Sequence, residues 1–316
     1  MALYNVSVSP HVREQSTTKS IMRDVAIALI PTLAFGVYHF GYRALIVIAV
    51  SIVTCVASEL LFELISKKPV TVFDYSAVVT GMILAVNLPA SAPWWMVVLG
   101  GVFAIVVVKM LFGGLGQNFM NPALAARCFL LISFTSRMND FSDIDGVSSA
   151  TPLTLLKGGE TSDLLTLFLG YHGGCIGEVS AFAVLVGGLY LIIKRVISVR
   201  IPLTYIGSTA VFILIINAIS GGDTSVTYLL CQVLSGGLLV GAFFMATDYV
   251  TSPITPKGQI LYGVVLGLLT ALFRTLGASA EGVSYAIIIG NLLVPLIEKI
   301  TVPKPFGCEK TKGGKA

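Results

Sequence analysis

The chain has 316 residues, of which 55% are hydrophobic and 11% charged, and its mean hydropathy is +0.90. Soluble domains carry roughly 25% charged residues, so this composition indicates an integral membrane protein and excludes a large soluble catalytic domain. The net charge of +4 is too small to imply nucleic acid as a partner. The five cysteines are far apart and form no Cys-x-x-Cys pair, which argues against a thiolate-bound iron–sulfur or zinc site within the chain.

Apolar runs predict an all-α fold of ten transmembrane helices. The runs cover residues 22–40, 44–65, 75–89, 94–112, 121–136, 178–194, 201–220, 227–247, 258–275 and 282–299. The expected domains are a tail at 1–21, a five-helix unit at 22–136, a loop at 137–177, a second five-helix unit at 178–299 and a tail at 300–316. The polar N-terminal tail lacks the apolar core of a signal peptide, so we expect no cleaved leader.

Lysine and arginine residues predict the orientation of these helices. They concentrate in both tails and in the loops on the same side of the predicted membrane. The opposite side carries only Arg43, Arg137, Lys157 and Arg274. Because positively charged loops stay in the cytoplasm, we expect both termini to be cytoplasmic and the 137–177 loop to face outward.

The two halves share a pattern that suggests an internal repeat. Gly81 precedes Asn87 by six residues, and Gly241 precedes Thr247 by six. A five-helix unit repeated once has to be inverted, because five is an odd number. Inverted repeats with helices interrupted by glycine or proline place binding sites where the broken helices meet. The alternative is that glycine-rich helices only pack closely together.

The outward loop contains Asp145-Gly followed by Ser148-Ser149-Ala150-Thr151. An Asp-Gly turn presents the hydroxyl groups that follow it, and these are suited to accept a phosphoryl-linked group. A threonine hydroxyl needs a base or a metal to act as a nucleophile, so an external transferase would be required. Composition by itself favours an ordinary Ser/Thr-rich loop.

This segment also resembles the flavinylation motif Asp-x-x-Ser/Thr-Gly-Ala-Thr. The motif belongs to a family of membrane proteins that includes the D subunit of the Rnf complex and the B subunit of the sodium-translocating NADH:quinone reductase. The resemblance implies that Thr151 carries FMN through a phosphoester bond, attached by an FMN transferase outside the cytoplasmic membrane. It also implies that Asp145, Ser148, Ser149 and Ala150 form the cofactor site. Ser149 stands where the motif usually has glycine, and since a small residue is retained we expect modification to survive.

The resemblance extends over nearly the whole chain. The matching residues are Gly114-Leu-Gly-Gln-Asn118-Phe-Met-Asn121-Pro122 and Phe244-Met-Ala-Thr247-Asp248. The chain lacks the N-terminal extension of the quinone-reductase relative, which favours the Rnf branch. That branch implies an electron-transfer subunit in the bacterial inner membrane, within a complex that couples ferredoxin and NAD oxidoreduction to Na⁺ or H⁺ translocation. The implied partners are the membrane-embedded A and E subunits, the flavoprotein G subunit, and the peripheral B and C subunits of the Rnf complex.

The resemblance adds a second group of expected ligand-binding residues: Asn118, Asn121, Arg127 and Thr247 for a cofactor. A non-covalent riboflavin between the spans is the second implied flavin. Asp248 ends a span among hydroxyl groups that suit a hard cation such as Na⁺ or the polar edge of a flavin, or else it is a solvated helix-end acid. Asn121 alternatively caps a helix that begins at Pro122. Arg127 needs a partner inside its span, unless it snorkels to the surface.

Two acidic residues and a histidine have plainer interpretations. Glu59 and Glu63 share one helix face, and the sequence favours interfacial acids facing Lys67 over a proton relay. His172 is expected to be a loop residue. Two other functions stay open: a substrate channel or secondary transporter without a chromophore, and a structural scaffold in which Thr151→Val costs no function. No complete catalytic site is expected in this chain alone.

Overall fold

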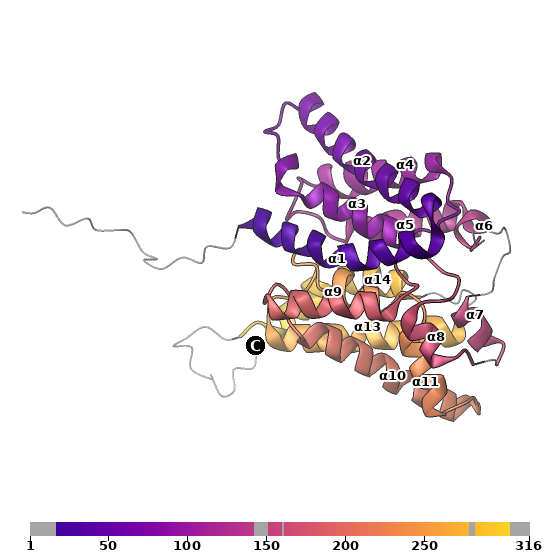
Figure 1. Ribbon diagram of the computed structural model, residues 1–316. Helices are drawn as coiled ribbons and strands as arrows, with labels where there is room; N and C mark the ends of the chain where they lie inside the picture. The colour runs from indigo at the N-terminus through magenta and orange to yellow at the C-terminus, as the bar shows by residue number, and fades with distance from the viewer. Residues whose placement is uncertain (1–16, 142–150, 160, 278–281, 304–316) are drawn as a thin grey trace, which may run out of the picture.

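The computed structural model describes residues 17–141, 151–159, 161–277 and 282–303 (Figure 1). The outer parts of both expected tails, at 1–16 and 304–316, lie outside the described residues. Within the described ranges the regular structure is helical, and the single β-bridge joins Pro89 to Cys175. The expectation of an all-α fold is therefore confirmed for this part of the chain.

The first half of the chain forms the upper group of helices in Figure 1. It contains α1 (Thr18–Phe40), α2 (Tyr42–Ile65), the 3₁₀ turn η1 (Val72–Asp74), α3 (Ser76–Val86), α4 (Trp94–Val102), the π-helix η2 (Phe103–Met110), α5 (Pro122–Ser133) and α6 (Thr135–Met138). Helix α2 packs on α3 and α4, so these helices form one compact layer.

The second half forms the lower group in the same view. It contains α7 (Pro152–Lys157), α8 (Leu164–Leu169), α9 (Ala181–Ile193), α10 (Arg200–Ser220), α11 (Val226–Leu234), α12 (Leu238–Val240), the π-helix η3 (Gly241–Met245), α13 (Pro256–Leu276) and α14 (Val283–Thr301). Helices α10 and α13 make the most extensive pairing in this group, and α14 packs beside α13.

Five of the described helices are long and apolar enough to cross a membrane, namely α1, α2, α10, α13 and α14. Helix α11 and the α12–η3 segment, bent by 61° at a short break, make a sixth candidate span. Helices α3, α4–η2, α5 and α9 are apolar but shorter. All ten predicted segments fall on these helices, and the chain is a multi-pass membrane protein. Helix α3 is short because Pro89 follows it and cannot continue a helix.

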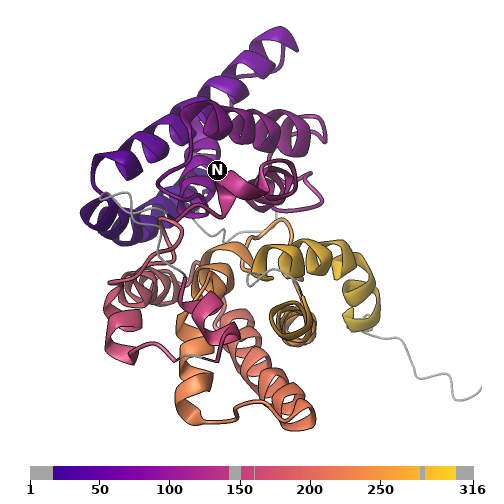
Figure 2. The ribbon, with the colours of Figure 1, turned by 90° about the vertical axis from the view of Figure 1, so that its right-hand side faces the viewer.

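The two halves meet along two helix pairs, α1 with α9 and α5 with α14 (Figure 2). The α1–α9 contact is close because Gly187 has no side chain. A Cβ atom at Gly187 would lie 2.1 Å from the carbonyl oxygen of Ala28. Small residues allow this close approach of helix backbones, which is a common way for membrane helices to associate.

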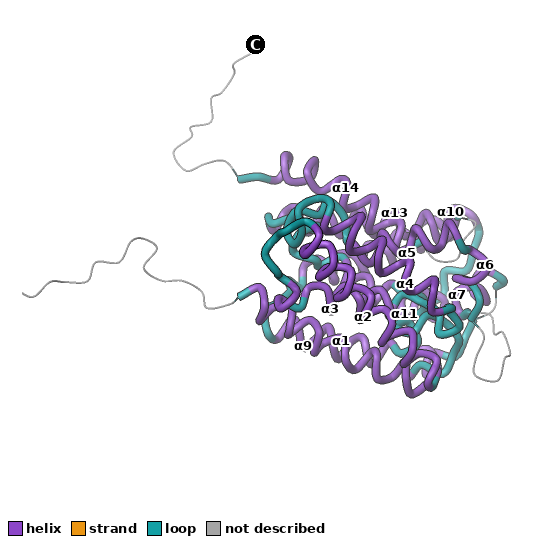
Figure 3. The backbone as a smooth tube through the Cα atoms, turned by 90° about the horizontal axis from the view of Figure 1, so that it is seen from above, coloured by secondary structure: helices purple, strands orange, loops and turns teal. Residues whose placement is uncertain are grey.

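The helical bundle has two distinct ends, visible from above in Figure 3. Helix α1 begins and α14 ends at one of them, which we call the termini end. The short helices α6, α7 and α8 and the start of α11 lie at the other, which we call the loop end.

A connector at residues 173–180 joins the loop end to the helices of the second half. Its backbone N–H groups at Ile176 and Gly177 donate to the carbonyl oxygens of Leu88 (3.0 Å) and Val86 (2.9 Å). The last carbonyl groups of a helix have no hydrogen-bond partner within that helix. The connector supplies N–H donors to these carbonyl groups at the end of α3. This pairing fixes the connector, and with it Glu178, between the two halves.

Candidate functional site

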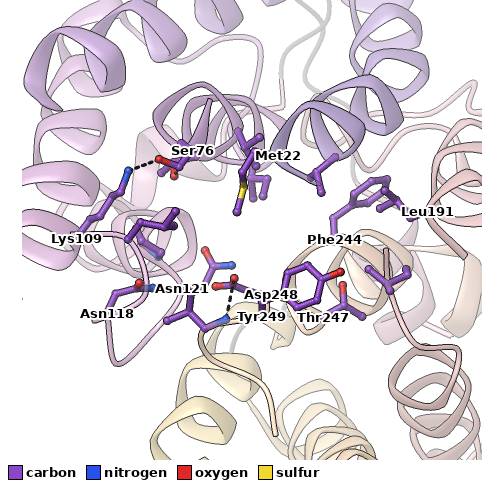
Figure 4. A pocket seen from close by; sticks show the side chains of 18 of the residues that line it. Met22, Ser76, Lys109, Asn118, Asn121, Leu191, Phe244, Thr247, Asp248 and Tyr249 are labelled. Carbon is purple, nitrogen blue, oxygen red and sulfur yellow. Dashed lines mark hydrogen bonds between the residues drawn. The ribbon is translucent and has the colours of Figure 1, made fainter. Parts of the chain in front are cut away.

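A cavity of about 80 Å³ opens between the two halves near the termini end (Figure 4). Its polar lining consists of Ser76, Thr80, Lys109, Asn118, Asn121, Thr247 and Asp248. Apolar side chains from α1, α3, α9 and η3 and from the neighbouring loops form the rest of the wall. The termini-end cavity thus brings together Asn118, Asn121, Thr247 and Asp248, four of the residues that the sequence suggested for ligand binding.

Both π-helices of the described chain border this cavity. Helix η2 contributes Lys109, and η3 contributes Phe243 and Phe244. A π-helix is wider than an α-helix and occurs most often as a short segment at functional sites. Its presence on both sides of one cavity marks the cavity as the central candidate site of the molecule.

The two asparagines hold the chain that forms one wall of the cavity. Asn121 caps α5, because its Oδ1 accepts hydrogen bonds from the backbone N–H groups of Ala123 (3.1 Å) and Leu124 (3.4 Å). Pro122 occupies the first turn, as the sequence indicated. Asn118 donates from Nδ2 to the carbonyl oxygen of Met120 at 3.1 Å. The Asn121 amide NH₂ group is therefore the part of that side chain available to a ligand.

Asp248 and Thr247 face the cavity from the loop that follows η3. The Asp248 carboxylate accepts from the backbone N–H of Val250 (3.4 Å) and from Oγ1 of Thr251 (3.2 Å). Thr247 donates from Oγ1 to the carbonyl oxygen of Phe243 at 2.7 Å. Among the residues that the structure describes, no group of three or more His, Cys, Asp and Glu side chains could hold a metal ion.

Lys109 carries a buried positive charge at the cavity wall. Its Nζ lies 2.9 and 2.8 Å from the two carboxylate oxygens of Glu59 and 2.7 Å from Oγ of Ser76. The side chains of Lys109 and Glu59 are 2% and 1% exposed. Three acceptors thus satisfy the three N–H groups of the ammonium, which therefore acts on the cavity through its charge.

The prediction that Glu59 and Glu63 face Lys67 at the membrane surface is wrong. Glu59 is paired with Lys109, and Glu63 accepts from the backbone N–H of Thr71 at 3.0 Å. Both carboxylates are buried, because the face of α2 that carries them packs toward η1 and η2. Lys67 lies beyond the end of α2 and is exposed.

Arg127 lies outside the termini-end cavity, in the middle of α5. Its Nη2 atom lies 3.2 Å from Oε1 of Glu178, and its Nη1 atom donates to Oδ1 of Asn87 (2.8 Å) and Oγ of Ser284 (3.0 Å). The predicted need for a partner is met, and Arg127 does not snorkel, since it is 2% exposed. We call these four residues the Arg127 cluster; it joins α3 and α5 to the connector and to α14.

Thr151 lies at the loop end as the N-cap of α7. Its Oγ1 lies 2.7 Å from Oγ1 of Thr154, and Thr151 is 8% exposed. Asp145, Ser148, Ser149 and Ala150 lie outside the described residues. A second cavity, of about 10 Å³, adjoins Thr151. The residues that line this loop-end cavity are Thr151, Pro152, Leu153, His172, Gly173, Gly174, Glu178 and Gly236.

His172 is more than the loop residue that the sequence suggested. Its Nδ1 lies 3.0 Å from the carbonyl oxygen of Gly173, while its Nε2 is buried without a hydrogen-bond partner among the described residues. Burial lowers the pKa of this imidazole more than the backbone groups of Gly173 and Val179 raise it, so the ring is neutral at neutral pH. Two glycines follow His172 in the chain and leave room around the ring; no other sequence signal indicates this site.

A buried arginine also holds the break between α11 and α12. Arg274 donates to the carbonyl oxygens of Gln232 and Ser235, the latter at 3.1 Å. A cation at the end of α11 satisfies carbonyl groups that the break leaves open. Gly236 has a φ of +67°, which glycine adopts readily, and it lines the loop-end cavity. The break therefore shapes one wall of the cavity beside Thr151.

Comparisons with known proteins cover nearly the whole chain. Residues 5–307 match the model of the NQR2, RnfD, RnfE family. The chain is 51% identical to the D subunit of the Na⁺-translocating ferredoxin:NAD⁺ oxidoreductase complex of Acetobacterium woodii, over 97% of this chain and 96% of that protein. It is 40% identical to the D subunit of the proton-translocating ferredoxin:NAD⁺ oxidoreductase complex of Clostridium ljungdahlii, over 98% and 97%. The D subunit of an ion-translocating oxidoreductase complex of Shewanella amazonensis is 36% identical, over 96% and 98%.

Proposed function

The chain belongs to the NQR2, RnfD, RnfE family, and from this premise we propose that it is the D subunit of an ion-translocating ferredoxin:NAD⁺ oxidoreductase complex. In this role it is a membrane electron-transfer subunit of a redox-driven Na⁺ or H⁺ pump. The similarity over 97% of the chain to the Acetobacterium protein carries the proposal. Relatives at 51% and 40% identity are named for different ions, so membership of the family is compatible with either Na⁺ or H⁺.

The proposed topology has ten spans in two inverted five-helix units. The first unit runs from α1 to α5 and the second from α9 to α14, each with an interrupted or shortened third helix. A buried basic residue lies near the end of the fourth helix of each unit, Lys109 in η2 and Arg274 in α13, which supports a repeat. Because most Lys and Arg residues lie in the tails and the loops of the termini end, that end is cytoplasmic and the loop end is outside.

Thr151 is the proposed attachment point for covalent FMN. The unpartnered Nε2 of His172, buried beside Thr151, supports a polar group at this position that the described chain does not supply. The loop-end cavity has room for about one water molecule, so the phosphate would lie at its edge, and the flavin ring outside it. FMN supplies the electron transfer when bound. The chain itself would hold the linkage at the N-cap of α7, and Glu178, the partner of Arg127, lines the cavity beside it.

In-gel flavin fluorescence under denaturing conditions tests the attachment. The wild-type chain, Thr151→Val and Thr154→Val are each co-expressed with an FMN transferase. Thr154 is the matched control because its hydroxyl contacts that of Thr151 in the same helix. We expect fluorescent bands for wild type and Thr154→Val and a dark band for Thr151→Val. A dark wild-type band, with the transferase active on a known substrate, would overturn covalent attachment and favour a transporter without a chromophore.

The termini-end cavity is the proposed site of a second, non-covalent flavin such as riboflavin. Apolar walls from α3 and η3 suit an aromatic ring, and Asn118, Asn121 and Thr247 suit its polar edge. Asp248 lies at the same cavity and is the proposed ligand for a Na⁺ ion or for the flavin edge.

Extraction of flavin from the purified Thr151→Val complex tests this second site, because that variant lacks the covalent flavin. We expect acid precipitation to release a flavin into the supernatant, and Asn118→Ala to lower its amount. Asn139→Ala, at an exposed position after α6, is the control and leaves the amount unchanged. Equal amounts from Asn118→Ala and Asn139→Ala would place the flavin elsewhere in the complex.

A further inference from the structure

His172 carries a buried ring nitrogen at the loop end to which the proposed attachment assigns no specific role. It comes from the segment between α8 and α9, and it lines the loop-end cavity together with Thr151 and Glu178. Its Nε2 atom is shielded from solvent and makes no hydrogen bond of good geometry within the described part of the chain; the backbone of Val179 interacts with the ring only weakly. A buried polar atom without a hydrogen bond is destabilising, so this arrangement calls for a group that supplies one.

The tautomer of His172 follows from its other nitrogen. Nδ1 lies 3.0 Å from the carbonyl oxygen of Gly173, and a carbonyl can only accept, so Nδ1 carries the hydrogen. Nε2 of the neutral ring therefore has a lone pair and no hydrogen. Such an atom becomes a donor only when it takes up a proton, and an anion placed beside it favours that change.

The described charged groups near the cavity do not prevent an anion from binding there beside a protonated imidazole. Glu178 lines the same cavity, but its carboxylate is paired with Arg127 at 3.2 Å, so the two charges largely compensate. The other titratable group that acts on His172 is His39 on α1, which disfavours a positive ring through like-charge repulsion when it is protonated. A phosphodiester on Thr151, which lines the same cavity as His172, carries one negative charge and favours the protonated ring.

We propose that His172 takes up a proton from solvent and donates a hydrogen bond from Nε2 to the phosphate that links flavin to Thr151. This inference rests on the proposed attachment at Thr151 and adds the residue that recognises the linkage. The imidazolium neutralises the diester, and the hydrogen bond fixes the start of the flavin side chain at the edge of the cavity. His172 is thus a positioning residue whose charge depends on whether the flavin is present.

Phosphorus NMR of the flavin-loaded complex tests this proposal by following the diester signal between pH 5 and 9. A phosphodiester itself does not titrate in that range, so the proteolytic flavin peptide gives a flat reference. In the intact complex we expect one transition, centred above the ordinary histidine value of 6.5. A flat profile in the intact complex would overturn the proposal without the use of any variant.

Two histidine variants identify the group responsible for the transition. We expect His172→Gln to abolish it, because the amide can donate a hydrogen bond but does not titrate. His39→Gln is the matched control, and we expect the transition to persist there with at most a small shift to higher pH. A transition that survives in His172→Gln and disappears in His39→Gln would assign the effect to His39 and overturn the proposal.

The flavin band in a denaturing gel separates failure of this inference from failure of the proposed attachment. We expect the wild type and both histidine variants to give fluorescent bands of similar strength. A fluorescent band together with a flat phosphorus titration would refute the role of His172 and leave Thr151 as the attachment point. A dark wild-type band would refute the attachment, and the role of His172 with it.

Discussion

Two buried ion pairs of similar composition occupy different places in the described structure. Lys109 and Glu59 join η2 to α2 within the first half, and Oγ of Ser76 is the third acceptor of the ammonium. Arg127 and Glu178 join α5 to the connector, with further hydrogen bonds to Asn87 and Ser284. The first pair is a local contact beside the termini-end cavity. The second ties both halves together, so the chemistry of a pair does not by itself determine what depends on it.

Among the changes that test this difference, replacement of Arg127 is expected to cause the largest loss of stability. Arg127→Leu leaves the Glu178 carboxylate buried without its positive partner and deprives Asn87 and Ser284 of a donor. We expect a loss of roughly 5 kcal/mol or more in the free energy of unfolding, seen as a failure to accumulate in the membrane. Arg137→Ala, at an exposed position in α6, is the control and should accumulate normally. Normal accumulation of Arg127→Leu would show that the cluster is dispensable for assembly.

The pair in the first half should be replaceable as a unit. Lys109→Met alone isolates the buried Glu59 charge, and we expect a loss of about 3–5 kcal/mol in stability. Glu59→Leu with Lys109→Met removes both charges and should recover most of that loss. The thermal midpoint of the purified complex measures both. The corresponding double change of Arg127 and Glu178 should recover little, because two further partners stay unsatisfied; equal recovery would remove the distinction.

A smaller effect is expected at Asn121, which lies next to the helix that carries Arg127. Asn121→Ala removes the cap of α5, and loss of such a cap costs about 1 kcal/mol. Asn121→Asp keeps an acceptor for the same N–H groups and should retain the wild-type thermal midpoint. If Asn121→Asp is destabilised as much as Asn121→Ala, the amide group rather than the cap determines the stability at this position.

The smallest expected effect is a pH dependence at the loop end when flavin is absent. Burial lowers the pKa of His172 from 6.5 in Thr151→Val, so the unfolded chain binds more protons than the folded one below that value. The contribution of neutral His172 to stability is therefore complete above pH 6.5 and declines as the pH falls toward the folded-state pKa. We expect the thermal midpoint of Thr151→Val to fall more between pH 8 and pH 5.5 than that of Thr151→Val with His172→Gln.

The sequence predicts local features of this molecule better than its long-range contacts. Apolar runs locate the helices, and Asn121-Pro122 predicts the start of α5 correctly, because both signals act over a few residues. Lys109 and Glu59 are 50 residues apart, and Arg127 and Glu178 are 51 apart, so nothing near either residue indicates its partner. Lys67 is near Glu59 in sequence, whereas its actual partner Lys109 is near it only in the folded structure; the sequence pattern therefore predicts the wrong pair.

His172 shows the same limit at the candidate site. Its ring is placed by the connector that pairs with the end of α3, and that pairing joins residues far apart in the chain. Asn118, Asn121, Thr247 and Asp248 were found because two short motifs contain them, and the structure brings the two motifs to one cavity. Ser76 and Lys109 complete that cavity without belonging to either motif.

Helix α3 lines the termini-end cavity and is hydrogen-bonded, at its other end, to the connector that contributes to the loop-end cavity. Ser76, Val79, Thr80 and Ile83 line the termini-end cavity, while the carbonyl oxygens of Val86 and Leu88 hold the connector that carries Glu178 to the loop-end cavity. The helix has 11 residues and spans about 16 Å. A rigid rod of this length transmits a displacement at one end directly to the other. A change in the shape of one cavity that shifts α3 along its axis therefore also displaces residues at the second cavity. This coupling does not require movement of the loops between the two cavities.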